Sequence, residues 1–155
     1  MERTLVLIKP DGIQRKLVGE IIKRFENKGL KIVGLKLIDI SIPLAKRLYE
    51  MHKDKPFFRY LIKFTTTGPN VALVLEGREA VSMARKIIGA TTPEESRPGS
   101  IRGDYAIHER FNLAHSADSK KNAEREISLL FKPQELCKYF QILHPWLYGG
   151  KGIDR

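Results

Sequence analysis

The chain has 155 residues, of which 42% are hydrophobic and 30% charged, and its formal net charge is +10. Length and composition predict one soluble globular domain over residues 1–155. No apolar run is long enough for a membrane span, and the first residues show no signal-peptide pattern. The single cysteine, Cys137, excludes an intramolecular disulfide and indicates a reducing compartment, so we expect a cytoplasmic protein.

The positive charge suits a polyanionic partner, either a nucleic acid or a phosphorylated small molecule. Most lysines and arginines are spread over predicted helices and loops, without a basic tail and without interleaved aromatic residues that would stack on bases. This distribution argues against nucleic-acid binding as the main function. Four positive residues near Gly, Thr, Pro or Phe are not explained as solvated helix faces: Lys9, Arg59, Arg85 and Arg102.

The N-terminal part predicts a strand, a turn and a helix. Residues 4–9 are an apolar run typical of a strand, and Pro10-Asp11-Gly12 predicts a turn after it. Apolar residues from Leu17 to Phe25 then recur at helical spacing, and Gly29 predicts the end of that helix.

A second strand and two helices follow. Residues 31–40 predict a strand that carries Val33, Leu35 and Leu37 on one face. Pro43 predicts the start of a helix that continues to about His52. Pro56-Phe57-Phe58 predicts another that reaches about residue 65.

The second half predicts a buried strand over residues 71–75 and a helix over residues 81–88. Residues 91–111 show no regular pattern, and so long a loop in a compact domain is more often functional than idle. A short strand over 112–115 and a helix over 120–131 complete the order. With the extra helices set aside, this is a βαββαβ plan, so we predict an α+β, ferredoxin-like α/β sandwich with an antiparallel four-stranded sheet.

His115 is the strongest candidate for chemistry among the four histidines. It stands just before the helix over 120–131, and Glu126 lies at the edge of the apolar face of that helix. A carboxylate beside an apolar face needs a partner, because an unpaired buried charge is costly. If Glu126 accepts a hydrogen bond from one ring nitrogen, the other nitrogen is left neutral and nucleophilic. The alternative is that His115 is an ordinary histidine at a strand end. We interpret His52 as a surface residue.

Five blocks of sequence carry a resemblance to a known family. They are T-L-V-L-I-K-P-D-G at 4–12, K-P-F-F at 55–58, G-A-T at 89–91, R-P-G-S-I-R-G-D at 97–104 and N-L-A-H-S-A-D-S at 112–119. In their order and content they resemble nucleoside diphosphate kinase. The resemblance implies phosphoryl transfer between nucleoside triphosphates, such as ATP, and nucleoside diphosphates. The mechanism would be ping-pong through a phosphohistidine, with Mg2+ bound through the nucleotide phosphates and no metal site on the protein.

The resemblance also implies roles for particular residues. His115 matches the phosphorylated histidine and Glu126 the carboxylate that orients it, and Tyr49 matches a phenol near that histidine. The remaining residues match the nucleotide site: Lys9 and Asn112 for the ribose hydroxyls, with Lys9 also near the transferring phosphate, Phe57 for stacking on the base, and Arg85, Thr91 and Arg102 for the phosphates. Stacking tolerates any base, which predicts broad nucleotide use.

The family is usually hexameric and sometimes tetrameric, so we expect a homo-hexamer. Ser116-Ala117 replaces the usual Gly-Ser after the histidine, and Glu109-Arg110-Phe111 replaces the small apolar residue that usually closes over the base. Two other functions stay open from the sequence, a nucleic-acid-binding protein and an inactive relative kept for oligomerisation. The segment 151–155 carries no interpretable pattern.

Overall fold

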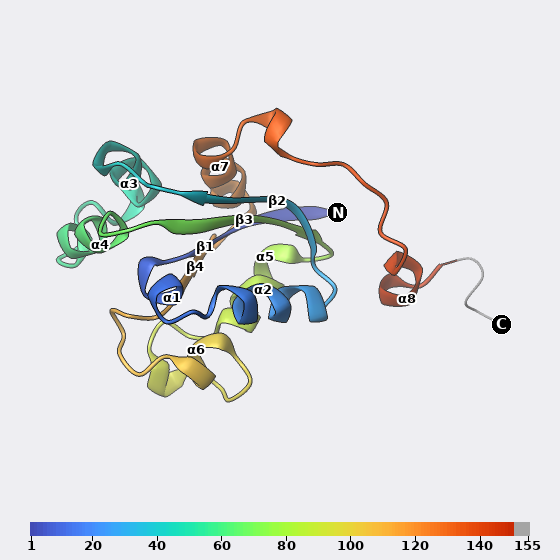
Figure 1. The fold of residues 1–155 in the computed structure, drawn as a ribbon, viewed down its shortest axis with the longest axis horizontal. Helices are drawn as coiled ribbons and strands as arrows, with labels where there is room; N and C mark the ends of the chain where they lie inside the picture. The colour runs from blue at the N-terminus through green and yellow to red at the C-terminus, as the bar shows by residue number, and fades with distance from the viewer. Residues whose placement is uncertain (151–155) are drawn as a thin grey trace.

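A computed structural model describes residues 1–150 of the chain. Its centre is a four-stranded antiparallel sheet in the order β2-β3-β1-β4 (Figure 1). The strands are β1 (Glu2–Ile8), β2 (Lys31–Ile38), β3 (Asn70–Gly77) and β4 (Ala114–Ser116). This arrangement is the predicted ferredoxin-like α+β plan, with β1 in the middle because its residues are apolar on both faces.

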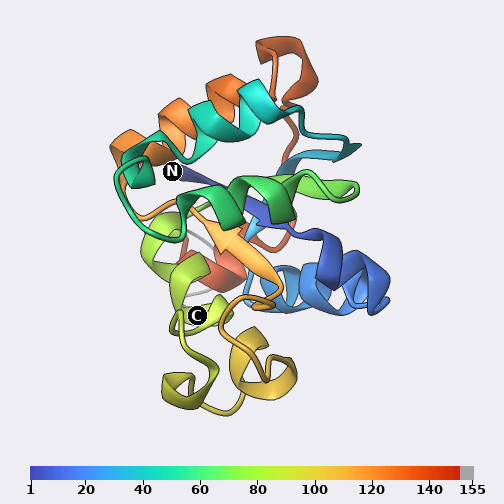
Figure 2. The ribbon, with the colours of Figure 1, turned by 90° about the vertical axis from the view of Figure 1, so that its left-hand side faces the viewer.

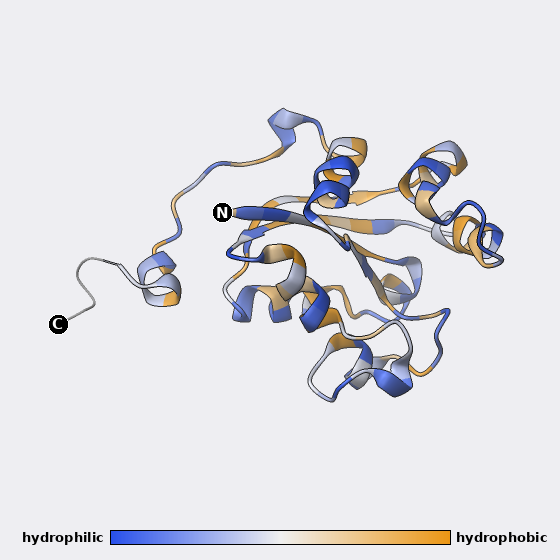
Figure 3. Ribbon diagram, turned by 180° about the vertical axis from the view of Figure 1, so that it is seen from behind, coloured by the Kyte–Doolittle hydropathy of each residue, from blue (hydrophilic) through white to orange (hydrophobic). Residues whose placement is uncertain are grey.

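Helices cover both faces of the sheet (Figures 1 and 2). Val6 and Ile8 of β1 pack with α2 (Val18–Asn27) and α5 (Ala80–Ile88) on one face. Leu5 and Leu7 pack on the other face with α3 (Ile42–Leu48) and α7 (Lys120–Leu130), next to α4 (Phe58–Thr65). Burial of these two apolar layers stabilises the fold, and the helices show mixed hydropathy along their turns, as amphipathic helices do (Figure 3). The other elements are α1 (Pro10–Gln14), η1 (Glu50–His52), η2 (Pro93–Glu95), α6 (Ile101–Tyr105), η3 (Pro133–Glu135) and α8 (His144–Tyr148).

The turn predicted at Pro10-Asp11-Gly12 is instead the start of α1. Proline suits a first helical turn, because its φ is already helical and its missing N–H would have no partner there. Gly12 serves close packing, since a Cβ at this position would lie 2.7 Å from Ile8 Cγ2 and 3.2 Å from the Leu113 carbonyl oxygen.

The regular alternation predicted for β2 is wrong. A β-bulge between Ile32 and Gly34 changes the register with β3, so Val33 and Leu35 no longer share a face. Val33 is buried, whereas Leu35 and Leu37 are 53% and 67% exposed. The regular apolar spacing hid the bulge, and the available signal was Gly34, since an isolated glycine inside a strand often marks one.

The segment 91–111 is more ordered than predicted. It contains η2 and α6, and Ser100 caps α6 by accepting a hydrogen bond from the Gly103 amide. Gly103 has no room for a side chain, since a Cβ there would lie 2.0 Å from the Arg97 carbonyl oxygen. Among the helices of residues 1–150, none has the length and apolar character needed to cross a membrane. The segment 151–155 lies outside the described residues.

Candidate active site

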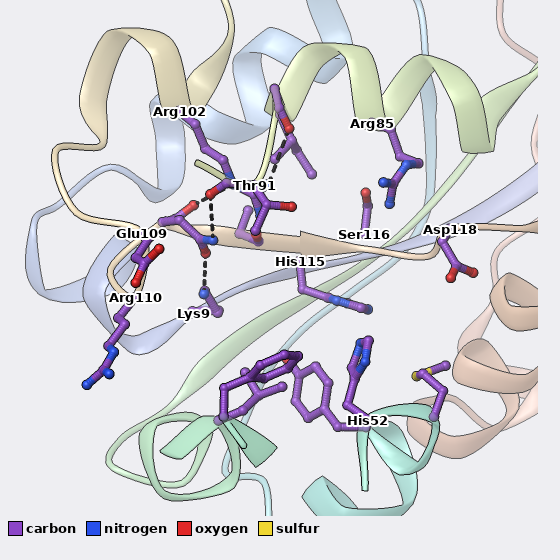
Figure 4. A pocket seen from close by; sticks show the side chains of 18 of the residues that line it. Lys9, His52, Arg85, Thr91, Arg102, Glu109, Arg110, His115, Ser116 and Asp118 are labelled. Atoms are coloured by element: carbon purple, nitrogen blue, oxygen red, sulfur yellow. Dashed lines mark hydrogen bonds between the residues drawn. The ribbon is translucent and has the colours of Figure 1, made fainter. Parts of the chain in front are cut away.

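A cavity of ≈ 580 Å³ opens beside β4 and contains all the site residues predicted from the sequence (Figure 4). Its walls come from the end of β1, the region from α3 to α4, the C-terminal half of α5, the loop before β4, and β4 itself. The predicted residues that line it are Lys9, Tyr49, Phe57, Arg85, Thr91, Arg102, Asn112, His115 and Glu126. Arg59, which the sequence also singled out, is exposed on α4 and is not part of the lining.

His115 and Glu126 form the hydrogen bond expected from the sequence. Pairing of β4 with β1 places His115 opposite Leu7, and α7 brings Glu126 to it from the other side. The ring Nε2 lies 2.9 Å from Glu126 Oε2, and Glu126 is 1% exposed. Because a buried carboxylate accepts the Nε2 proton, the neutral ring carries its lone pair on Nδ1. Within the described part of the chain, no hydrogen bond engages Nδ1.

Tyr49 holds the histidine ring from the side. The two ring centroids are 5.4 Å apart and the planes meet at 80°, an edge-to-face contact. Burial raises the pKa of the Tyr49 phenol, so this group stays protonated. Its oxygen is buried and makes no hydrogen bond to the described residues.

Lys9 and Asn112 form a second polar pair. Lys9 Nζ donates to Asn112 Oδ1, and Asn112 Nδ2 donates to the Thr91 carbonyl at 3.4 Å. Lys9 is 5% exposed, and burial lowers its pKa from 10.5 to about 8, against the opposing charge of Asp11. The protein itself therefore neutralises this ammonium poorly, which favours an anionic ligand.

A residue with a strained backbone lies between Asn112 and His115, the members of the two polar pairs that this segment supplies. Leu113 is fully buried and has a φ of 73°, a left-handed conformation that a leucine adopts at a cost of about 1–2 kcal/mol. Its amide donates to Asp11 Oδ2 at 3.0 Å, and its carbonyl accepts from the Lys9 amide at 2.9 Å. Asp11 thus fixes the turn from which Asn112 and His115 project. This role of Asp11 was not predicted.

Arg102 is engaged mainly by the backbone. Its guanidinium donates to the carbonyl oxygens of Asn112 and Ala114 at 3.0 and 2.6 Å, and to those of Gly89 and Ala90 at 3.2 Å. Burial and the neighbouring Arg85 lower its pKa to about 10, so Arg102 keeps its charge at neutral pH. It ties β4 to the end of α5, in addition to any contact with a ligand.

Arg85 is differently placed. It projects from α5 into the cavity near Asp118 and Ser116 (Figure 4), and its guanidinium makes no hydrogen bond to residues 1–150. This exposed arginine fork, which has no hydrogen-bond partner within residues 1–150, suits bidentate contact with a phosphate.

The cavity also contains residues that the sequence did not predict. His52, interpreted as a surface residue, lines the cavity and its ring centroid lies 5.4 Å from that of Phe57. Burial and the nearby His115 lower the His52 pKa. Its position three residues after Tyr49, on the same helical side, was the available signal. Met51, Tyr60 and Leu61 were also not predicted, whereas Glu109, Arg110, Ser116 and Asp118 stand in segments that the family resemblance had marked without giving them a role. The remaining lining residues are Ile88, Gly89 and Ala114.

Comparison with known proteins identifies the family. A family model described as nucleoside diphosphate kinase matches residues 2–136. The nucleoside diphosphate kinase of Sulfurisphaera tokodaii is 56% identical over 144 residues, which cover 93% of this chain and 98% of that protein. This chain belongs to the nucleoside diphosphate kinase family. It is therefore a phosphotransferase that moves the terminal phosphate of a nucleoside triphosphate to a nucleoside diphosphate, through the phosphohistidine intermediate general to the family.

Solved structures of the family confirm the fold. A family protein from Babesia bovis has a TM-score of 0.92 and 42% identity, covering 96% of this chain and 100% of that one. A halophilic nucleoside diphosphate kinase from Halobacterium salinarum, in complex with CDP, has a TM-score of 0.91 and 45% identity, covering 95% and 98% of the two chains.

Proposed function

We propose that His115 is the residue that carries the phosphate in this nucleoside diphosphate kinase. Nδ1 attacks the terminal phosphorus of a nucleoside triphosphate, an N–P bond forms, and the bond from phosphorus to the bridging oxygen breaks, so that a nucleoside diphosphate leaves. The terminal oxygen of a second nucleoside diphosphate then attacks the same phosphorus and frees Nδ1. The observation that carries this assignment is the 2.9 Å hydrogen bond to buried Glu126, which leaves Nδ1 as the nucleophilic nitrogen.

The other side chains would position the nucleotide and neutralise its charge. Arg85, Arg102 and Thr91 are suited to hold phosphate oxygens, and Lys9 brings a poorly neutralised ammonium to the same cavity. Asn112, held by Lys9, would contact the ribose with it. Phe57, 49% exposed at the cavity, offers a stacking face for the base.

We infer that Mg2+ enters with the nucleotide. Within residues 1–150, no three His, Cys, Asp or Glu side chains are grouped to hold a metal ion. The nucleotide phosphates would therefore supply the inner ligands, and Asp118, at the same end of the cavity as Arg85 (Figure 4), could accept hydrogen bonds from metal-bound water. When bound, the ion would share the charge of the triphosphate.

We further propose that residues 1–155 form one cytoplasmic domain that assembles as a homo-hexamer, with nucleoside di- and triphosphates as its partners. The support is the family resemblance for the assembly and the composition for the compartment. Sedimentation of the purified protein tests the assembly.

Labelling tests the assignment of His115. The protein incubated with γ-labelled ATP and Mg2+ should form an acid-labile, base-stable phosphoprotein, and His115→Gln should form none while keeping its circular dichroism spectrum. His108→Gln, outside the cavity, is the matched control and should label normally. Labelling of the His115→Gln protein at the parent level would contradict the covalent role.

A further inference from the structure

The end of the cavity formed by the loop before β4 differs chemically from the end at which Arg85 lies. Arg110 lies with its guanidinium carbon 4.8 Å from the Tyr60 ring centroid, and the rings of Phe111 and Phe64 are 5.4 Å apart in an edge-to-face contact. These two contacts fasten the loop to α4. Glu109, the residue before Arg110, is therefore held at the rim of the cavity that Phe57 also lines.

Figure 4 shows how the charged groups are divided. Glu109 and Arg110 lie at one end of the cavity, where Lys9 and Arg102 are also drawn, whereas Arg85, Ser116 and Asp118 lie at the other end. The guanidinium of Arg110 is occupied by the face of Tyr60, a cation–π contact. Of the two charged groups that the loop brings to this end, Glu109 is thus the one left free to meet a ligand.

The carboxylate of Glu109 has no hydrogen bond or ion pair within the described residues, and it is exposed. An unpaired carboxylate in a cavity that binds a polyanion repels its ligand. The repulsion is offset only if the carboxylate contacts a part of the ligand that carries donors and no charge. In a nucleotide, that part is the edge of the base.

We propose that Glu109 selects the base, and that it favours guanine. This inference rests on the function proposed above, with the base stacked on Phe57. Guanine presents N1–H and its 2-amino group side by side, and two parallel donors match the two oxygens of a carboxylate, as the fork of an arginine does. Adenine and cytosine present one amino group beside a ring nitrogen whose lone pair repels a carboxylate. Uracil presents one N–H between two carbonyl oxygens.

The two methylene groups of Glu109 allow its carboxylate to reach the base edge while they cover the base face. Stacking on Phe57 still accepts every base, so Glu109 adds a preference to a site of broad specificity. A site that hydrogen-bonds a donor pair discriminates against ligands that lack one or both donors.

Calorimetric binding of nucleoside diphosphates with Mg2+ tests the proposal. GDP should bind the parent about tenfold more tightly than UDP, with IDP, which lacks the 2-amino group, between them. Glu109→Gln should bring the ratio of the GDP and UDP affinities within about twofold, because an amide cannot accept both hydrogen bonds. The affinity for UDP should not fall, since one repulsive charge is removed. Glu94→Gln removes an exposed carboxylate outside the cavity and should leave the ratio unchanged.

Equal affinities for GDP and UDP in the parent would overturn the proposal, as would an unchanged ratio in Glu109→Gln; the first result would mean that Glu109 is a solvated surface carboxylate. Binding is measured without phosphoryl transfer, so these outcomes are independent of the role given to His115. If labelling fails while the binding ratios are as expected, the phosphate-carrying role of His115 is contradicted and base selection by Glu109 is still supported.

Discussion

Glu126 acts on His115 from a buried position on α7, and that burial decides what the pair can do. In the proposed mechanism the imidazole gains positive charge as the phosphate is transferred, and a carboxylate already aimed at Nε2 would stabilise that charge without reorganisation. The same hydrogen bond keeps Nδ1 directed into the cavity. Tyr49, packed edge-on against the ring, restricts its rotation. Glu126 thus supplies both charge and orientation, and Tyr49 adds to the orientation alone.

Glu126→Gln separates these contributions. The amide oxygen can still accept from Nε2, so the ring stays oriented, but the charge of the carboxylate is lost. We expect turnover to fall about ten- to a hundredfold, on the order of 1.4–2.7 kcal/mol in the barrier, in steady-state assays. The exposed Glu124→Gln on the same helix is the control and should match the parent. Parental turnover in Glu126→Gln would mean that the contact has no catalytic role.

Burial of the Lys9 ammonium lowers the free energy of unfolding by an amount that depends on pH. Its pKa is about 8 in the folded protein, against 10.5 for the free side chain, so the unfolded chain binds more protons between these pH values and stability rises with pH across that window. Lys9→Met removes this cost, worth up to about 3 kcal/mol below pH 8, although it leaves Asn112 Oδ1 without a donor.

We therefore expect Lys9→Met to resist denaturant better than the parent at pH 7, with the advantage shrinking as pH rises from 8 to 10.5. It should be severely impaired in transfer, because a cation near the phosphate is lost. In the parent, kcat/KM should decline as pH rises through about 8. Lys63→Met, exposed on α4, should show neither effect. A stability difference that is constant over this pH range would contradict the lowered pKa.

The backbone elements around the cavity are aligned by contacts between segments far apart in sequence. Asp11 of α1 holds the amide of Leu113 in its left-handed conformation, and Arg102 of α6 holds the carbonyl oxygens on either side of that residue. The start of β4 is therefore fixed from two sides. These contacts, together with the pairing of the short strand β4, place His115 against Glu126.

Asp11→Ala tests that alignment. It removes a charged hydrogen bond to a strained residue, so we expect a loss of about 1.5–3 kcal/mol in the free energy of unfolding. Transfer should fall as well, because Asn112 and His115 lose their common support. Urea unfolding of the purified variant measures the first effect. Asp39→Ala, at an exposed site, should be neutral, and an equal effect in both variants would show that the Asp11–Leu113 contact is unimportant.

The net charge of +10 belongs to the surface of the whole molecule. We expect this charge to support only weak binding of nucleic acids, because scattered positive residues bind a polyanion less well than a continuous patch. Turnover should therefore persist when single- or double-stranded DNA is added at physiological salt. Nucleotide binding should weaken only modestly with salt, since one nucleotide is held by few charges. Competitive inhibition by DNA, with a steep salt dependence, would show that the basic surface is functional.

The sequence by itself determined the family, the order of the four strands and of the longer helices, and the His115–Glu126 pair. These features are local: short motifs, apolar periods of two and 3.6 residues, and a strand followed directly by its helix. Each motif or element can be read within about a dozen residues, because the residues that define it are neighbours along the chain, and the family follows from the order of five such motifs.

The tertiary structure decided the rest. The bulge at Ile32–Gly34, the left-handed Leu113 held by Asp11, and the carbonyl contacts of Arg102 all depend on packing between distant segments. The same is true of His52, an ordinary surface residue by sequence, and of Glu109, which the sequence marked only as a departure from the family pattern. They reach one cavity because the α3–α4 region and the loop before β4 face each other. Periodicity predicts which face of an element is buried, but which exposed residues meet is set by how the elements pack.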